Sequence, residues 1–314
     1  MLPSRNVSLR PTSFLLVGIP GLEARQHWVA IPLCAMYIVA LLGNCVILLI
    51  ISMDPNLHKP MYLFLAMLAI TDLVMCTSAT PRTLSIFWLG SREIGSHTCL
   101  TQMFFIHSSS LVESGVLVTM AFDRYTAVCN PLQYTTMMKI TTVAKMTMLM
   151  LVRGLILIAP FPLLLSRLPF CQASIIPHSY CEHMAVVKLA CADTTINAAY
   201  RLMVALLVGG LDVLCIALSY IMILRAVFSL PSGQARIKTL STCTSHVCVI
   251  LIFYVPGLFS FLAHRFGQSV PQSIHVLLAN LYLLLPPTLN PIVYRVKTKQ
   301  LRTRVSRVFC MRCA

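Results

Sequence analysis

Charged residues are scarce in this sequence: only 11% of its 314 residues are Asp, Glu, Lys or Arg, and just 9 are acidic. Soluble domains carry roughly 25% charged residues, so this composition excludes an ordinary soluble fold. Hydrophobic residues make up 58% of the chain, and its mean hydropathy is +0.82. The chain also lacks a recognisable cleavable signal peptide, because the apolar patch at residues 14–19 is too short. We therefore expect the first membrane span to act as its own insertion signal.

Seven apolar stretches reach the length of about 20 residues that a helix needs to cross a bilayer. They run approximately over residues 28–53, 60–87, 100–127, 142–165, 196–228, 237–264 and 273–294. The sequence thus predicts an all-α membrane protein, a seven-transmembrane helix bundle over residues 28–294. Residues 1–27 form an extracellular N-terminus, and residues 295–314 a cytoplasmic segment. Trp28 and Trp88 fall at the expected outer span ends, where interfacial aromatic residues gather.

The net charge is +15. It does not indicate binding to nucleic acid, because the basic residues lie in short segments between spans, and their distribution predicts how the chain is oriented in the membrane. One side carries fourteen Lys and Arg residues against two acids, and the other nine against four. The side richer in basic residues is cytoplasmic, so the N-terminus is outside. Asn6 begins a glycosylation sequon on that exterior side. Residues 297–309 alternate basic and apolar side chains, which suits an amphipathic helix on anionic membrane lipids; a disordered basic tail is the alternative.

Four of the 13 cysteines differ from the rest because they fall in the outer connections, where disulfides persist. They are Cys99, Cys171, Cys181 and Cys191. Four cysteines allow three sets of pairings, and their number alone does not choose among them.

Two carboxylates lie where a charge is costly, inside predicted spans. Asp72 lies about 18 Å into the second span, and Glu113 is roughly 16 Å from the cytoplasmic end of the third. The two therefore share a depth near the middle of the membrane. If their helices are neighbours, both can be ionised only with a cation such as Na⁺ between them; otherwise one is protonated. No cofactor is required.

The third span and the end of the sixth carry candidates for an outer ligand site. At 100° per residue, His107, Leu111 and Gly115 share one face of the third span, about 120° away from the face of Glu113. His107 can line a cavity there or simply hydrogen-bond a neighbouring helix. Arg265 ends the sixth span at the outer edge. Its guanidinium can clamp a carboxylate there, or extend into solvent.

Six segments, in order and at matching depths, resemble those of odorant receptors, which are rhodopsin-like G-protein-coupled receptors. They are residues 43–44 (GN), 60–64 (PMYLF), 120–129 (MAFDRYTAVC), 219–220 (SY), 238–246 (KTLSTCTSH) and 286–294 (PPTLNPIVY). Phe122 in place of the commoner Tyr, residues 264–267 (HRFG) and the doubled proline at 286–287 resemble the class I, fish-like branch and its family 52. Thr126 for the commoner Val is a small departure.

The resemblance implies features that the residues alone leave open. It pairs Cys99 with Cys181 and Cys171 with Cys191, and it implies that Asp72 and Glu113 can hold a sodium ion. It implies a plasma-membrane receptor that activates a heterotrimeric G protein of the stimulatory, olfactory class. The residues assigned to G-protein coupling and the activation switch are Asp123, Arg124, Tyr125, Tyr220, Lys238, His246 and Tyr294.

Class I receptors often detect short- or medium-chain carboxylic acids, so the resemblance favours Arg265 as the carboxylate anchor. We expect His183 to help roof the site and the acid's tail to pack on apolar residues of the third and fifth spans. Pro256-Gly257 offers a pivot in the sixth span. The expected lining residues beside Arg265 and His183 are Phe104, His107, Leu111, Gly115, Leu207, Leu211 and Phe261, the last of which is apolar where some acid receptors have a hydroxyl.

Two other classes fit the sequence less well. A transporter or channel could use paired intramembrane carboxylates, but the chain has no evident inverted repeat and no matched pair of broken half-helices. A metalloprotein could use His178, Cys181 and His183, but Cys181 is expected in a disulfide and no His-Glu-x-x-His motif occurs. We therefore expect a receptor and not an enzyme.

Overall fold

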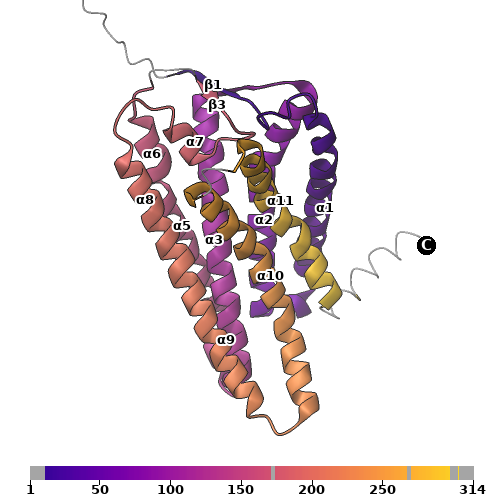
Figure 1. Ribbon diagram of the computed structural model, residues 1–314. Helices are drawn as coiled ribbons and strands as arrows, with labels where there is room; N and C mark the ends of the chain where they lie inside the picture. Colours follow the sequence, from indigo (N-terminus) through magenta and orange to yellow (C-terminus); the bar gives the residue numbers. More distant parts are fainter. Residues whose placement is uncertain (1–10, 171–173, 267–269, 298–302, 304–314) are drawn as a thin grey trace, which may run out of the picture.

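The computed structural model describes residues 11–170, 174–266, 270–297 and 303, and it contains seven helical segments long and apolar enough to span a membrane. Figure 1 shows them side by side in one elongated bundle. The predicted spans are confirmed, with ends that extend up to a few residues further. They are α1 (Gln26–Met53), α2 (Pro60–Leu89), α3 (Ser96–Cys129), α5 with α6 (Ile140–Ile158 and Pro160–Ser166), α8 with η2 and α9 (Thr195–Ala205, Leu206–Asp212 and Val213–Phe228), α10 (Gly233–Phe266) and α11 (Gln272–Lys297).

Proline and glycine residues mark the ends of several of these helices. Pro60 occupies the first turn of α2, where its missing N–H costs nothing. The same helix ends at Gly90, whose φ of +65° is a left-handed conformation that other residues rarely adopt. Pro160 begins α6, so the fourth span is divided there into two helices.

The fifth span contains a π-helical stretch, η2, between α8 and α9. Its seven residues include Gly209 and Gly210, which are poor helix formers in an otherwise apolar helix. A π turn holds more residues than an α turn, and such turns are rare and frequently lie at functional sites. Its effect is to change which side chains of the fifth span face the bundle.

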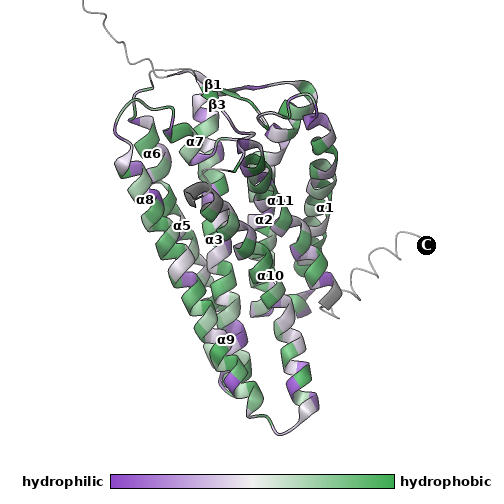
Figure 2. Ribbon diagram, in the orientation of Figure 1, coloured by the Kyte–Doolittle hydropathy of each residue, from purple (hydrophilic) through white to green (hydrophobic). Residues whose placement is uncertain are grey.

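The bundle is built around α3. Within the apolar 18-residue stretch of each span, 67% of the residues of α3 are buried inside the structure, against 17% for the fifth span. The fifth span therefore presents most of its apolar side chains outward, where a bilayer rather than protein would cover them. Figure 2 shows hydrophobic residues along the middle of the helices and hydrophilic residues concentrated toward their ends.

A small three-stranded sheet lies at the end of the bundle that charge predicts to be extracellular, here called the outer end (Figure 1). Its strands are β1 (Ser13–Leu16), β2 (Glu93–Gly95) and β3 (Ile175–Ile176), in the order β2-β1-β3. The β1–β2 pair is antiparallel and the β1–β3 pair is parallel. Phe14 and Leu16 of β1 are buried. The first residues of the apolar patch that is too short to span a membrane thus lie in a strand, and this small sheet accompanies the predicted all-α bundle, which is confirmed.

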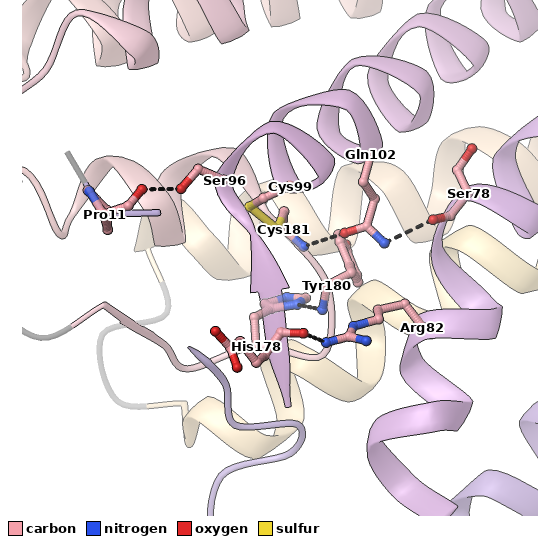
Figure 3. Close-up of a disulfide and its surroundings, with 10 residues drawn as sticks. Pro11, Ser78, Arg82, Ser96, Cys99, Gln102, His178, Tyr180 and Cys181 are labelled. Atoms are coloured by element: carbon pink, nitrogen blue, oxygen red, sulfur yellow. Dashed lines mark hydrogen bonds between the residues drawn. A yellow bond between two sulfur atoms is a disulfide. The ribbon is translucent and has the colours of Figure 1, made fainter. Parts of the chain in front are cut away.

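A disulfide joins the outer end of α3 to the long outer connection. Cys99 and Cys181 are bonded with an S–S distance of 2.03 Å, as the resemblance implied. Gln102, one turn further along α3, reinforces this link (Figure 3). Its Oε1 accepts from the backbone N–H of Cys181 at 3.0 Å, and its Nε2 donates to the carbonyl of Ser78 in α2 at 2.9 Å. The connection is thereby fixed over the outer ends of α2 and α3.

Three short helices complete the connections: η1 (Pro55–Leu57), α4 (Tyr134–Met137) and α7 (His183–Val187). Cys191 is also disulfide-bonded, and its predicted partner Cys171 lies outside the described residues. Asn6 and the predicted amphipathic helix after α11 lie outside them as well.

The role of Gln102 predicts a stability defect when its side chain is removed. Gln102→Ala leaves the buried Cys181 N–H without its acceptor, which costs about 1–3 kcal/mol. We expect a thermal unfolding midpoint lower by several degrees for the detergent-solubilised protein. Gln133→Ala, which removes an exposed glutamine at the other end of the bundle, is the control. Equal midpoints for the two variants would contradict the proposed link.

Candidate functional site

A cluster of aromatic rings lies below the outer connection, where α3, α6, α7 and α8 meet. The ring of Phe161 is at its centre. It stacks on His107 of α3 with 5.6 Å between ring centroids, and it makes edge contacts with His183 of α7 at 4.6 Å and Tyr200 of α8 at 5.4 Å. Leu111 packs in the same cluster, with Phe104 beside it. The structure therefore brings Phe104, His107, Leu111 and His183 together, and their contact with a ligand stays a prediction.

The roof of this cluster contains charges that are already paired. Glu182 accepts from the backbone N–H of Ala185 at 2.7 Å, which caps α7, and it forms an ion pair with Arg201 of α8 at 3.5 Å. Beside it, His183 is almost completely buried. Burial, with the nearby His107 ring, lowers the pKa of His183 to about 3. His183 is therefore neutral at physiological pH and can offer hydrogen bonds but no positive charge.

Arg265 and Phe261 belong to the last turns of α10, which ends at Phe266 at the outer end of the bundle. Their backbone thus lies at the predicted level. Their side chains are outside the part of the chain that the structure describes, so the predicted carboxylate contact stays a prediction.

Two predicted lining residues of the fifth span face the wrong way. The exposed fraction is 46% for Leu207 and 54% for Leu211, and both lie along an open apolar groove on the outside of the fifth span. The side chains that face the cluster are Tyr200, Val204 and Val208. Tyr200 and Val204 lie in α8, and the inward spacing of four residues continues through Val208 and Asp212 in the wide turns of η2. The prediction for Leu207 and Leu211 is therefore corrected.

Gly115, another predicted lining residue, packs against α5. A Cβ atom built on Gly115 would meet the side chain of Met150 in α5 at 2.9 Å. The glycine allows α3 and α5 to approach closely, which is the usual role of small residues between membrane helices.

Sequence reasoning missed a charged network below the aromatic cluster. Arg153 of α5 binds Asp212 of η2 through two hydrogen bonds, of which the Nη1–Oδ1 distance is 2.8 Å. Ser114 of α3 donates to Asp212 at 2.5 Å, and its hydroxyl also meets the hydroxyl of Tyr254 in α10 at 2.7 Å. The network joins four of the seven spans. Arg153 and Asp212 are charges inside spans, so the rule that identified Asp72 and Glu113 could also have found them.

The intramembrane carboxylates Asp72 and Glu113 converge on Asn290 of α11. Asn290 donates its amide to both oxygens of Asp72, at 3.2 and 3.0 Å. Both carboxylate oxygens of Glu113 and the side-chain oxygen of Asn290 are buried without a hydrogen-bond partner among the described residues. Three unpartnered oxygens beside a second carboxylate are a donor set that suits a hard cation.

The predicted switch residues gather at the opposite, inner end. The Tyr220 hydroxyl hydrogen-bonds His246 Nδ1 at 2.8 Å, which ties α9 to α10. Asp123 accepts from the Tyr134 hydroxyl of α4 at 2.7 Å, while neighbouring Arg124 donates to the sulfur of Met61 in α2. The other members are the buried Tyr294, the partly buried Tyr125 and the exposed Lys238.

Sequence reasoning also missed Leu132, in the turn between α3 and α4. Its exposed fraction is 95%, the highest among the exposed large hydrophobic residues. An apolar side chain held this far into solvent beside the switch residues is a candidate contact for a partner protein.

The alternative of a metal site formed by His178, Cys181 and His183 lacks one of its three ligands. Cys181 is in the disulfide with Cys99, so it has no thiolate to bind a metal ion. Among the described residues, no group of three or more His, Cys, Asp and Glu side chains is arranged to hold one.

The Arg153–Asp212 pair predicts an asymmetric mutational response. Asp212→Ala leaves Arg153 inside the bundle without its partner, which costs about 3 kcal/mol, whereas replacing both members by apolar residues can be nearly neutral. We expect Asp212→Ala to reduce surface expression and the unfolding midpoint strongly. The double variant Arg153→Met/Asp212→Leu should recover much of both, and Asp193→Ala, an exposed acid, serves as control. A double variant as unstable as the worse single variant would contradict this account.

Comparison with known proteins places this arrangement in a family. The family model described as "Olfactory receptor" matches residues 33–312. Olfactory receptor 52R1 of Homo sapiens is 55% identical over 310 residues, which is 99% of this chain and 98% of the relative. Human olfactory receptor 52N4 is 53% identical, with 98% and 96% covered, and olfactory receptor 52P1 is 54% identical, with 95% and 93% covered. The chain therefore belongs to the olfactory receptor family, and it is a multi-pass membrane receptor for odorants that signals through G proteins and is not an enzyme.

Proposed function

We propose that this receptor detects short- or medium-chain carboxylic acids at the outer end of the bundle. It then activates a stimulatory, olfactory-type G protein that raises cAMP. Its N-terminus lies outside the plasma membrane and its C-terminus in the cytoplasm. The observation that carries the proposal is the apolar, histidine-containing cluster around Phe161, which lies at the same end of the bundle as Arg265 on α10.

The cluster offers an acid an apolar surface for its tail. Leu111, Phe161 and Val204 pack together there, and burying each methylene of a ligand against them contributes about 0.8 kcal/mol. Neutral His183 and the paired Glu182 and Arg201 provide no free cation nearby. The carboxylate then pairs with Arg265, whose planar guanidinium matches its two oxygens.

Binding changes the receptor's state only if the active state holds the acid more tightly. Drawing Arg265 toward the acid moves the outer part of α10, and Pro256 lies inside that helix below it, where a proline removes a backbone hydrogen bond and allows bending. Next to the proline, a Cβ atom on Gly257 would lie 3.0 Å from the Tyr282 ring of α11. The hydroxyl of Tyr282 in turn meets that of Ser110 in α3 at 2.5 Å. Movement of α10 therefore acts directly on side chains that join it to α3 and α11.

At the inner end, activation separates the contacts that close the bundle. The Tyr220–His246 hydrogen bond holds α9 to α10, so outward movement of α10 must break or rearrange it. Arg124 then becomes accessible to the G protein. The exposed Leu132 inserts into an apolar pocket of the same partner.

Asp72, Glu113 and Asn290 fit a sodium ion in the resting state. The unpartnered oxygens of Glu113 and Asn290 would accept it, and the cation would allow both carboxylates to be ionised. A proton shared by the pair is the alternative, and Na⁺ dependence of basal activity distinguishes the two.

The carboxylate anchor is tested by Arg265→Ala in cells that report cAMP. We expect the response to a series of linear acids to fall at least tenfold in potency, because a charge-assisted pair worth about 1.5–3 kcal/mol is lost. Arg167→Ala, at the outer end of α6, is the matched control and should respond normally. The matched alcohols should be weak on every variant. Unchanged acid potency in Arg265→Ala at equal surface expression would overturn the assignment.

The inner contact is tested by Leu132→Asp. A charge cannot enter an apolar pocket on the G protein, so we expect agonist-stimulated G-protein activation to fall at least tenfold in membranes, as expected for a hot-spot residue worth about 2 kcal/mol or more. Agonist binding should persist. Gln133→Asp places the same charge on the neighbouring exposed residue and should couple nearly as well as the wild type. Equal losses in both variants would indicate a general charge effect and contradict the insertion of Leu132.

A further inference from the structure

A second hollow lies on the outside of the bundle, away from the aromatic cluster. Its volume is about 480 Å³, and residues of α2, β2 and α3 line it. Phe105 lines it, whereas His107 faces the cluster; two residues along an α-helix are about 200° apart, so the two sites occupy opposite sides of α3. The polar side chains of its wall, apart from the charged ones, are Thr77, Ser78, Thr98, Thr101 and Gln102.

Two opposite charges mark one edge of this hollow. Arg82 of α2 donates to the backbone carbonyl of Glu93 and, at 3.4 Å, to the hydroxyl of Ser91 (Figure 3 shows Arg82 on the same helix as Ser78). Its Nε is buried without a partner in the described part of the chain, and Nη1 and Nη2 each keep a second N–H that neither of these bonds uses. Within that same part, the Glu93 carboxylate is in no salt bridge. The edge thus offers a guanidinium with unused donors and, next to it, an unneutralised carboxylate.

The depth of Arg82 in the bilayer explains why its guanidinium favours an anionic partner in this hollow. Trp88, whose exposed fraction is 49%, marks the outer interface on α2. The backbone of Arg82 lies six residues, or about 9 Å, closer to the middle of the membrane, and its guanidinium reaches back outward to Ser91 and Glu93. A cation held at this edge of the hydrocarbon core is costly unless it draws an anion to it. In a bilayer, the anion at hand is the phosphate of a phospholipid.

We propose that this hollow binds a phospholipid with a zwitterionic headgroup, such as phosphatidylcholine. The phosphate accepts from Arg82, and the ammonium group lies beside Glu93. The exposed threonines contact the glycerol ester region, and the chains run down past Pro81 and Phe105. Because Arg82 also holds β2 in place, a lipid at this edge supports the outer sheet from the membrane side. The proposal concerns the bilayer and does not depend on which odorant the receptor detects.

The test is photocross-linking of the full-length receptor in nanodiscs that contain a phosphatidylcholine with a diazirine in its acyl chain. Peptides covering residues 77–105 should carry most of the label. Thr101→Phe fills the hollow from an exposed position on α3, and we expect labelling of these peptides to fall about fivefold, the change that roughly 1 kcal/mol produces. Ala198→Phe, another exposed site at the outer end of α8, is the control and should label normally.

A second variant tests the headgroup chemistry. Glu93→Gln keeps the backbone carbonyl that Arg82 binds and removes the carboxylate. Competition with unlabelled phosphatidylglycerol, which lacks the ammonium group, should therefore become several-fold more effective in this variant than in the wild type. Glu23→Gln, another exposed acid of the outer end, is its control. Label spread evenly around the seven spans, or a wild-type preference for phosphatidylglycerol, would overturn the proposal; thermal unfolding of each variant confirms that it is folded.

Discussion

A bilayer core supplies no water to a buried charge, and the Arg153–Asp212 pair is how this bundle meets that constraint. Asp212 is almost fully buried, and both of its oxygens are occupied by Arg153 and Ser114. Because Ser114 also meets Tyr254, the same carboxylate fixes the relative positions of α3, α5, η2 and α10. A hydrogen bond in this environment has no competing water partner, so it constrains helix position more strictly than apolar packing does. The arrangement of the aromatic cluster above and the switch residues below depends on it.

The seven spans could be predicted from sequence because each must supply its own run of apolar residues. The partners of their polar residues could not, since a pairing such as Asp72 with Asn290 joins residues 218 apart. The outer sheet escaped prediction for the same reason. Its strand β1 has four residues and pairs with segments about 80 and 160 residues away, so no local pattern marks it. The Cys99–Cys181 pairing was available only from the resemblance.

The fifth span shows where helical periodicity misleads. A regular α-helix repeats its faces every 3.6 residues, but the π turns of η2 hold more residues and rotate the side chains that follow. Val204, Val208 and Asp212 therefore face inward at intervals of four, and Leu207 and Leu211 turn toward lipid. Gly209 and Gly210 indicate an irregular helix, but they do not predict which way the side chains that follow are rotated. Gly115 is ambiguous in sequence for another reason, because a glycine can make room for a ligand or for a neighbouring helix. Here the structure places Met150 of α5 against it.

The distribution of charge at the outer end determines where the carboxylate of the proposed acid agonist can bind. Arg201 is engaged by Glu182, and His183 is kept neutral by burial, so the roof offers a carboxylate neither an unpaired cation nor a protonated imidazole. Glu182, being an anion itself, disfavours a second carboxylate close to α7 and α8. In the proposed binding mode, the acid group is therefore directed toward α10, and its tail toward Phe161 and Leu111. That polarity matters for signalling, because α10 carries both Arg265 at its outer end and His246 in the contact with Tyr220. In the proposed mode, the acid therefore acts on α10, the helix whose inner part is held by the Tyr220–His246 contact, whereas a ligand held only by Glu182, His183 and Arg201 would contact α7 and α8.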